Sequence, residues 1–215
     1  MFGPGSIEAQ EAHAEAFVAL ALEDGPVGAR PFGDGPREDP LPTDLEARPG
    51  DPPPGAFLDL GSGGGLPGLV LALRSASRGT LLDAQERRGA FLTEAVEQLG
   101  LATRIEVVAG RAENIARDPQ HRGRYGLVVA RSFAGPAVTA ECATGFLSPG
   151  GRLVVSEPPG GDPSRWSSTG LADLGFSEPR FAHAHGASAA LLDHPDPPSD
   201  RWPRRPGIPS KRPAW

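Results

Sequence analysis

Short apolar runs alternate with segments of helical periodicity from residue 56 to residue 194. Five runs that predict strands are AFLDL, GTLLDA, RIEVVAG, YGLVVAR and GRLVVSEP, which begin at residues 56, 79, 104, 125 and 151. Strands separated by helices are typical of a parallel sheet with crossover helices. Two further runs, FSEPRFAHA and ASAALLDH, meet at residues 185–186 and predict a closing antiparallel pair. We therefore expect an α/β fold with about seven strands in a mostly parallel sheet, helices on both faces and a C-terminal antiparallel strand pair.

The segments between these runs carry helix signals. In ERRGAFLTEAVEQLG, residues 86–100, Gly100 stands where a left-handed C-terminal cap belongs. Five apolar residues of this segment share one predicted helical face: Phe91, Leu92, Ala95, Val96 and Leu99. Pro136 suits the first position of the next helix, and LSPGG predicts a turn before the fifth strand.

The flanking segments differ from this central pattern. Residues 1–24 predict an amphipathic helix that Ser6 can cap, and residues 25–55 predict a linker, because 15 of the 31 residues from Gly25 to Gly55 are Pro or Gly. We place the folded domain at residues 56–195 and a basic, proline-rich tail at residues 196–215. Residues 201–215 carry five bases and no acid, although the whole chain has a net charge of −6.

Composition excludes several classes of protein. The single Cys142 rules out an internal disulfide framework, and no apolar run approaches the length of about 20 residues that a membrane helix requires. No segment resembles a secretory leader. We expect a cytoplasmic protein that is not embedded in a membrane. His183 and His185 are too few to form a zinc site, so we expect no metal.

The strongest chemical signal is FLDLGSGGGLPG, in which four glycines occupy five positions directly after a buried strand. Glycines here let the backbone turn sharply and approach a ligand, while the N-terminal amides of the next helix face it. Gly63, Gly65 and Gly68 also satisfy the dinucleotide fingerprint, which would favour NAD. Counted from Gly61, where the strand closes, the pattern is instead D-x-G-x-G-x-G.

That form resembles the first motif of class I S-adenosylmethionine-dependent methyltransferases, which have a Rossmann-like fold. By this resemblance Asp59, with Ser62, Gly63 and Gly65 of the turn, holds the methionine end of the cofactor. Asp83 ends the second strand 24 residues later, where a carboxylate can accept hydrogen bonds from both ribose hydroxyls. Its alternative role is to cap the helix that begins near Glu86.

Several motifs together resemble a narrower family. LDLGSGGGLPG, LLDAQERRGAFLTEAVEQLGL, GRAEN, VVARSFAGP and PRRPGIPSKRP are similar to the bacterial small-subunit ribosomal RNA guanine-N7 methyltransferases, formerly the glucose-inhibited division B family. The resemblance implies a cofactor pocket formed by Gly61, Leu66, Ala112, Glu113 and Arg131. Glu113 has the alternative interpretation of a solvated acid in a first helical turn.

Guanine N7 has a lone pair and no proton to lose, so the implied reaction needs alignment rather than a general base. We expect Arg131 to position the reactants; its alternative is a surface ion pair. The N/D-P-P-Y motif of amino-group methyltransferases is absent, and Cys142 lies inside a predicted helix, which argues against a cytosine-C5 enzyme. The family's Lys-Gly after the fifth strand is replaced by Ser156 and Glu157, followed by two prolines, and an acid there repels phosphate unless it pairs with Arg131.

The tail is the expected contact with RNA. Guanidinium and ammonium groups pair with phosphates, and a tail tryptophan can stack on an unpaired base. The expected substrate-binding residues are Arg204, Arg205, Lys211 and Arg212, with Trp202 or Trp215 as stacking groups. The alternative is that the tail packs on the domain's own acidic surface. Two other functions stay open: a methyltransferase for a small metabolite, and a non-catalytic S-adenosylmethionine-binding module.

Overall fold

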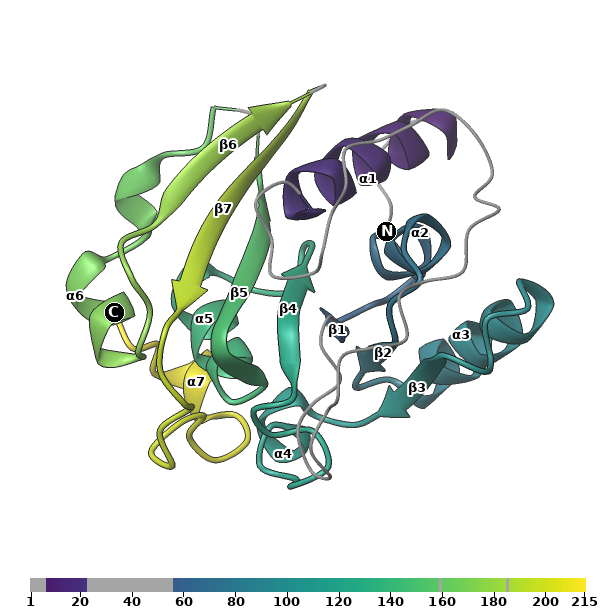
Figure 1. The fold of residues 1–215 in the computed structure, drawn as a ribbon. Helices are drawn as coiled ribbons and strands as arrows, with labels where there is room; N and C mark the ends of the chain where they lie inside the picture. The colour runs from purple at the N-terminus through teal and green to yellow at the C-terminus, as the bar shows by residue number, and fades with distance from the viewer. Residues whose placement is uncertain (1–6, 23–55, 159, 185) are drawn as a thin grey trace, which may run out of the picture.

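A computed structural model describes residues 7–22, 56–158, 160–184 and 186–215. Their seven strands form one sheet in the order β3-β2-β1-β4-β5-β7-β6 (Figure 1). The strands are β1 Phe57–Leu60, β2 Gly79–Asp83, β3 Ile105–Ala109, β4 Tyr125–Ala130, β5 Leu147–Glu157, β6 Arg180–Ala184 and β7 Ala187–His194. Pairing is parallel from β3 to β5, and β7 pairs antiparallel with both β5 and β6. The predicted fold class is confirmed.

Helices cover both faces of this sheet, as alternation along its strands requires. Helices α1 Ile7–Leu22, α2 Gly68–Arg74 and α3 Glu86–Gln98 pack on one face, where Phe57 and Leu127 lie in the same core cluster as Phe17 of α1. Helices α4 Ala112–Ile115, α5 Pro136–Thr144 and α6 Ser168–Asp173 pack on the other, over Leu58 and Val128. The short elements η1 Pro163–Arg165 and α7 Ile208–Lys211 also lie on the second side (Figure 1).

Helix α3 ends as predicted, and only part of its apolar face is buried. Gly100 has φ of +68°, its N–H donates to the carbonyl of Glu97, and the N–H of Leu101 donates to that of Val96, which is the Schellman arrangement. Leu92 and Val96 are buried, whereas Phe91 is 52% and Leu99 45% exposed. The predicted apolar face is therefore only partly buried, because only the narrow stripe aimed at β2 and β3 reaches the sheet.

Helix α1 is buried more completely than an amphipathic surface helix. It lies within the predicted residues 1–24, but the side chains buried in its second half go all round the helix: Ala14, Ala16, Phe17, Val18, Leu20, Ala21 and Leu22. Ser6 and the whole of the predicted 25–55 linker lie outside the described residues. The domain boundaries at 24, 55 and 195 therefore stay predictions.

Strand β5 begins earlier than expected. The LSPGG segment lies within β5, but the pairing with β4 jumps from Tyr125 opposite Leu147 to Leu127 opposite Arg152. Gly150 takes φ of +75° in this irregular stretch. The predicted turn is therefore a bulge inside the strand rather than a break before it.

Candidate functional site

The glycine turn lies between β1 and α2, where the strand order reverses between β1 and β4. Such a switch point is the usual ligand crevice of an open α/β sheet. Gly61, Gly63 and Gly65 all have positive φ, which side chains rarely adopt. A Cβ on Gly61 would lie 2.5 Å from the ring of Phe133, whereas the nearest atom to a Cβ on Gly63 would be 3.8 Å away. Packing therefore requires glycine at 61, while Gly63 borders open space that a ligand can use.

Asp59 holds this turn from inside. Its side chain is buried, and Oδ2 accepts a hydrogen bond of 3.0 Å from the N–H of Gly68. The Ser62 hydroxyl donates to the backbone carbonyl of Asp59 at 3.0 Å. Burial raises the pKa of Asp59 to about 7, although the bond from Gly68 and the charge of Arg131 oppose the rise. Oδ1 is buried and has no hydrogen-bond partner among the described residues, so the site keeps one unused acceptor.

Asp83 lies against the same turn. Its Oδ2 accepts from the N–H of Gly63 at 2.9 Å, and its Oδ1 accepts from the N–H of Gln85, just before α3, at 2.9 Å. The helix-cap interpretation is thus realised in part, and it does not exclude the ribose interpretation. Arg88 Nη1 also donates to Oδ2, at 3.5 Å, so one of the carboxylate's about four acceptor sites remains for a hydroxyl group.

Arg131 follows β4 at the edge of the crevice. Its Nη1 is buried and has no hydrogen-bond partner within the described part of the chain. Glu157 accepts hydrogen bonds not from Arg131 but from Arg165 Nη1 at 3.2 Å and from Trp166 Nε1 at 3.1 Å, so the pairing that would offset its repulsion of phosphate is made with Arg165. Nη1 of this half-buried residue is therefore a donor that the described residues leave unused.

A cavity of about 530 Å³ opens beside Arg131. Its walls come from α1, the segment after β4, the end of β5 and the residues around η1, and include His13, Phe133, Glu157 and Trp166. Burial and the charge of Arg131 lower the pKa of His13. Sequence reasoning assigned no site role to His13, Phe133 or Trp166, and it treated Glu157 only as an acid that repels phosphate. For Phe133 its place two residues after Arg131 was an available signal, whereas nothing local points to His13.

The adenine side of the predicted pocket is only partly free. Ala112 and Glu113 begin α4, and both are buried; Leu66 is half-buried in the glycine turn. Oε1 of Glu113 accepts from Arg111 Nη2 at 2.9 Å and from the N–H of Gly207 at 2.9 Å. Burial alone would raise the pKa of Glu113, but these bonds hold it below its usual value. The interpretation of Glu113 as a solvated acid is wrong, because the carboxylate joins α4 to the tail.

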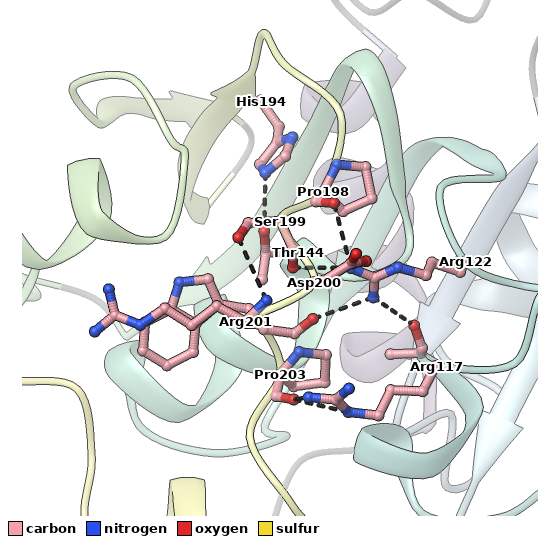
Figure 2. Close-up of polar contacts among 11 residues, drawn as sticks. Arg117, Arg122, Thr144, His194, Pro198, Ser199, Asp200, Arg201 and Pro203 are labelled. Carbon is pink, nitrogen blue, oxygen red and sulfur yellow. Dashed lines mark hydrogen bonds and ion pairs between the residues drawn. The ribbon is translucent and has the colours of Figure 1, made fainter.

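The tail, residues 196–215, is docked on the domain (Figure 2). Arg122 donates to the carbonyls of Pro198, Ser199 and Trp202 at 3.2, 2.8 and 3.1 Å. Arg117 donates twice to the carbonyl of Pro203, at 3.1 and 2.6 Å. Figure 2 shows both guanidinium groups turned toward the tail backbone. Such contacts with carbonyls fix the path of a segment that has no strand or long helix of its own.

Tail side chains complete the docking and change our expectation for Arg204. Its Nε donates to Oε1 of the fully buried Glu141 at 2.8 Å, and its Nη2 to Oε2 at 2.5 Å. Trp202 is 4% exposed and belongs to the core, and Trp215 packs on Gly170. Arg204 and both tryptophans are thus used internally, so the packing alternative holds for them. The exposed members of the predicted set are Arg205, Lys211 and Arg212.

The described residues contain no helix long and apolar enough to cross a bilayer. The same residues hold no group of three or more His, Cys, Asp or Glu side chains that could bind a metal ion.

Two solved methyltransferases share this architecture. The S-adenosylmethionine-dependent methyltransferase SibL superposes with a TM-score of 0.54 at 16% identity, over 66% of this chain and 51% of its own. A predicted O-methyltransferase from Agrobacterium tumefaciens superposes with a TM-score of 0.50 at 16% identity, over 66% of this chain and 74% of its own. At these identities the likeness establishes the fold alone.

Sequence comparison is more specific. Residues 49–157 match the model of the family described as rRNA small subunit methyltransferase G. The Ribosomal RNA small subunit methyltransferase G of Moorella thermoacetica is 36% identical over 172 residues, 75% of this chain and 70% of the relative. That of Deinococcus deserti is 36% identical over 170 residues, 74% and 68% of the two chains. The protein is a methyltransferase with S-adenosylmethionine as its cofactor, and it belongs to the rRNA small subunit methyltransferase G family.

Proposed function

We propose that this protein transfers a methyl group from S-adenosylmethionine to N7 of a guanine in small-subunit ribosomal RNA. The observation that carries the proposal is a pair of buried polar atoms without partners among the described residues: Asp59 Oδ1 in β1, and Arg131 Nη1 directly after the neighbouring strand β4. Buried polar atoms normally have partners, so an acceptor and a donor left unused at one switch point mark a place for a ligand with both kinds of group.

The charges of these atoms match the methionine end of the cofactor. Asp59 Oδ1 would accept from its ammonium group, and Arg131 Nη1 would donate to its carboxylate. Asp83 would hold the ribose hydroxyls. The adenine would lie by Gly61, Leu66, Ala112 and Glu113, contacting mainly their backbone, since the Glu113 carboxylate already binds Gly207.

When bound, the cofactor supplies a sulfonium-activated methyl group. Guanine N7 attacks through its lone pair and loses no proton, so the chain's task is to align the base and exclude water. Arg131 contributes by fixing the reactants rather than by accepting a proton. Because the reaction needs no general base, no His or carboxylate side chain has to lie near N7.

The other functions fit less well. A non-catalytic module would be favoured by a blocked glycine turn, whereas Gly63 borders open space. A closed apolar pocket would favour a small metabolite, but Arg131, His13 and Glu157 line the cavity. A ribosomal substrate also implies a cytoplasmic enzyme.

The exposed bases of the tail are the proposed site of binding to RNA phosphates. Changing Arg205, Lys211 and Arg212 together to Gln should lower RNA affinity. The dependence of that affinity on salt should also become shallower, by up to about 0.7 in slope for each phosphate that the variant no longer binds. Cofactor affinity should not change. An unaltered salt slope would move the RNA-binding surface to another part of the protein.

The decisive experiment is mass spectrometry of nucleosides from small-subunit RNA of a deletion strain and its parent. We expect 7-methylguanosine to fall in the deletion strain and to return with the wild-type gene but not with a Gly63→Val variant. Equal 7-methylguanosine in both strains, with no activity of the purified enzyme on unmethylated small subunits, would refute the proposal.

A further inference from the structure

We infer that the cavity beside Arg131 is a pocket for the acceptor base, in which Glu157 recognises the N1–H and N2–H₂ edge of guanine and Phe133 provides the stacking surface. This inference rests on the proposed function and names a specificity-determining residue for it. Enzymes that modify a base usually take it out of its stack and hold it by edge hydrogen bonds and aromatic contacts.

Phe133 connects this cavity to the cofactor site. Its half-buried ring lines the cavity and also lies over Gly61, where a Cβ would be 2.5 Å from a ring carbon. A base stacked on the exposed part of the ring would therefore lie next to the turn that holds the methyl donor. The cavity is at the place from which an acceptor must approach.

The backbone that presents Phe133 is strained. Ser132 has φ of +55°, the one positive value among the described residues other than glycine. A residue with a side chain adopts this conformation at a cost of about 1 kcal/mol or more, and such strain tends to persist at functional sites. The left-handed residue directs Arg131 and Phe133, on either side of it, into the same cavity wall.

Glu157 is fixed in the opposite part of the wall at the end of β5. Only 7% of it is exposed, and each carboxylate oxygen already accepts one hydrogen bond: Oε1 from Trp166 and Oε2 from Arg165. Donors that hold both oxygens preorganise the carboxylate. About half of its four acceptor sites remain for a ligand.

Guanine is the base that suits such a group. Its Watson–Crick edge carries two parallel donors, N1–H and N2–H₂, which match the two oxygens of a carboxylate as a guanidinium does. Adenine presents an acceptor at N1 to the same carboxylate, so its lone pair would face negative oxygen. A carboxylate thus selects guanine while leaving N7, on the far side of the ring, free to react.

The test combines a protein variant with a base analogue. Small subunits are reconstituted with guanosine or with inosine, which lacks the N2 amino group but keeps N7, at the methylated position, and kcat/KM is measured. For the wild type we expect inosine to lower kcat/KM about 10- to 100-fold, as loss of a hydrogen bond to a charged group does. In Glu157→Gln, activity on guanosine should fall by a similar factor and the guanosine-to-inosine ratio should drop below about threefold.

Controls separate recognition from folding. The exposed Glu178, which accepts a hydrogen bond from the Ser168 hydroxyl at 2.7 Å, is a matched acid outside the cavity lining, and Glu178→Gln should behave as the wild type. Phe133→Leu should lower kcat/KM on both substrates while keeping their ratio, because stacking does not distinguish the two bases. In Glu157→Gln the affinity for S-adenosylhomocysteine should stay within error, and the melting temperature should fall by only a few degrees, because the amide can accept one of the two hydrogen bonds but not both.

Outcomes for the two proposals are distinct. If the wild-type enzyme methylates neither substrate at N7, the proposed function fails. If it methylates guanosine and inosine equally, or if Glu157→Gln keeps the wild-type ratio, the base-recognition role of Glu157 is overturned. If Glu157→Gln has a much lower melting temperature but keeps the wild-type ratio of kcat/KM on guanosine to kcat/KM on inosine, Glu157 serves only to hold Arg165 and Trp166 in place.

Discussion

Replacing Arg204 with Ala should destabilise the whole domain, because this tail residue neutralises a buried acid. Glu141 lies in α5 with its side chain fully buried, and its two oxygens accept from Nε and Nη2 of Arg204 at 2.8 and 2.5 Å. The N–H of Arg204 also donates to Oε1, at 2.9 Å, and would survive the substitution. Arg204→Ala therefore removes the positive partner and leaves a carboxylate enclosed in the protein.

The expected cost is about 3 kcal/mol of unfolding free energy. Removing one partner of a buried ion pair costs about 3–5 kcal/mol, since the remaining charge is left uncompensated. The lower end applies here because 29% of the Arg204 side chain is exposed, and water can reach the carboxylate once the guanidinium is gone. At about 2–4 °C per kcal/mol for a chain of this size, the melting temperature should fall by about 6–12 °C.

Urea unfolding followed by circular dichroism measures this loss, with Arg205→Ala as the matched control. Arg205 is the next residue and is exposed, so its substitution should change stability by no more than about 0.5 kcal/mol. The double variant Arg204→Met, Glu141→Gln should regain much of the loss because it removes the buried charge. If Arg204→Ala is as stable as Arg205→Ala, the ion pair is not structural and Arg204 returns as a candidate for RNA binding.

Three further predictions concern the cofactor site. In Gly63→Val, calorimetry should detect no binding of S-adenosylmethionine, since the side chain fills the open face of the turn; wild-type affinity in this variant would remove Gly63 from the site. Asp59 has a pKa of about 7 in the free protein and should release a proton when the ammonium group of the cofactor binds beside it. Affinity for S-adenosylhomocysteine should therefore rise from pH 6 to pH 8 in the wild type and should not change with pH in Asp59→Asn. Folding stability without the cofactor should change with pH in the opposite direction: the raised pKa of Asp59 contributes stability that is fully present below about pH 4 and is lost as pH rises through 7. Equal dependence of unfolding on pH in the wild type and in Asp59→Asn would refute the raised pKa of Asp59. Arg131→Ala should strongly reduce the rate of methyl transfer and should hardly change the melting temperature. If the variant instead unfolds easily, and the fraction that remains folded is still active, the role of Arg131 is structural.

Much of the fold was predictable because its signals are local. Apolar runs of strand length, the left-handed Gly100 and the proline at the start of α5 depend on backbone geometry within a few residues. The glycine turn was predictable for the same reason, since closing a strand against a ligand requires residues without Cβ. The proximity of Asp59 and Asp83 to this turn followed from parallel strands ending at one edge of a sheet.

Which residues a side chain contacts in the folded protein depends on distant parts of the chain. Glu113 and Gly207 are 94 positions apart, and Glu141 and Arg204 are 63 apart, so no local pattern indicated that acids of α4 and α5 would bind the tail. Composition made the tail resemble an RNA-binding segment, because charge content is the same whether a guanidinium faces solvent or a buried carboxylate. The sequence by itself determined the class of fold and the glycine turn between β1 and α2. Only the tertiary structure decided which bases remain exposed and which groups line the acceptor cavity, because pairing and burial are properties of the packed chain.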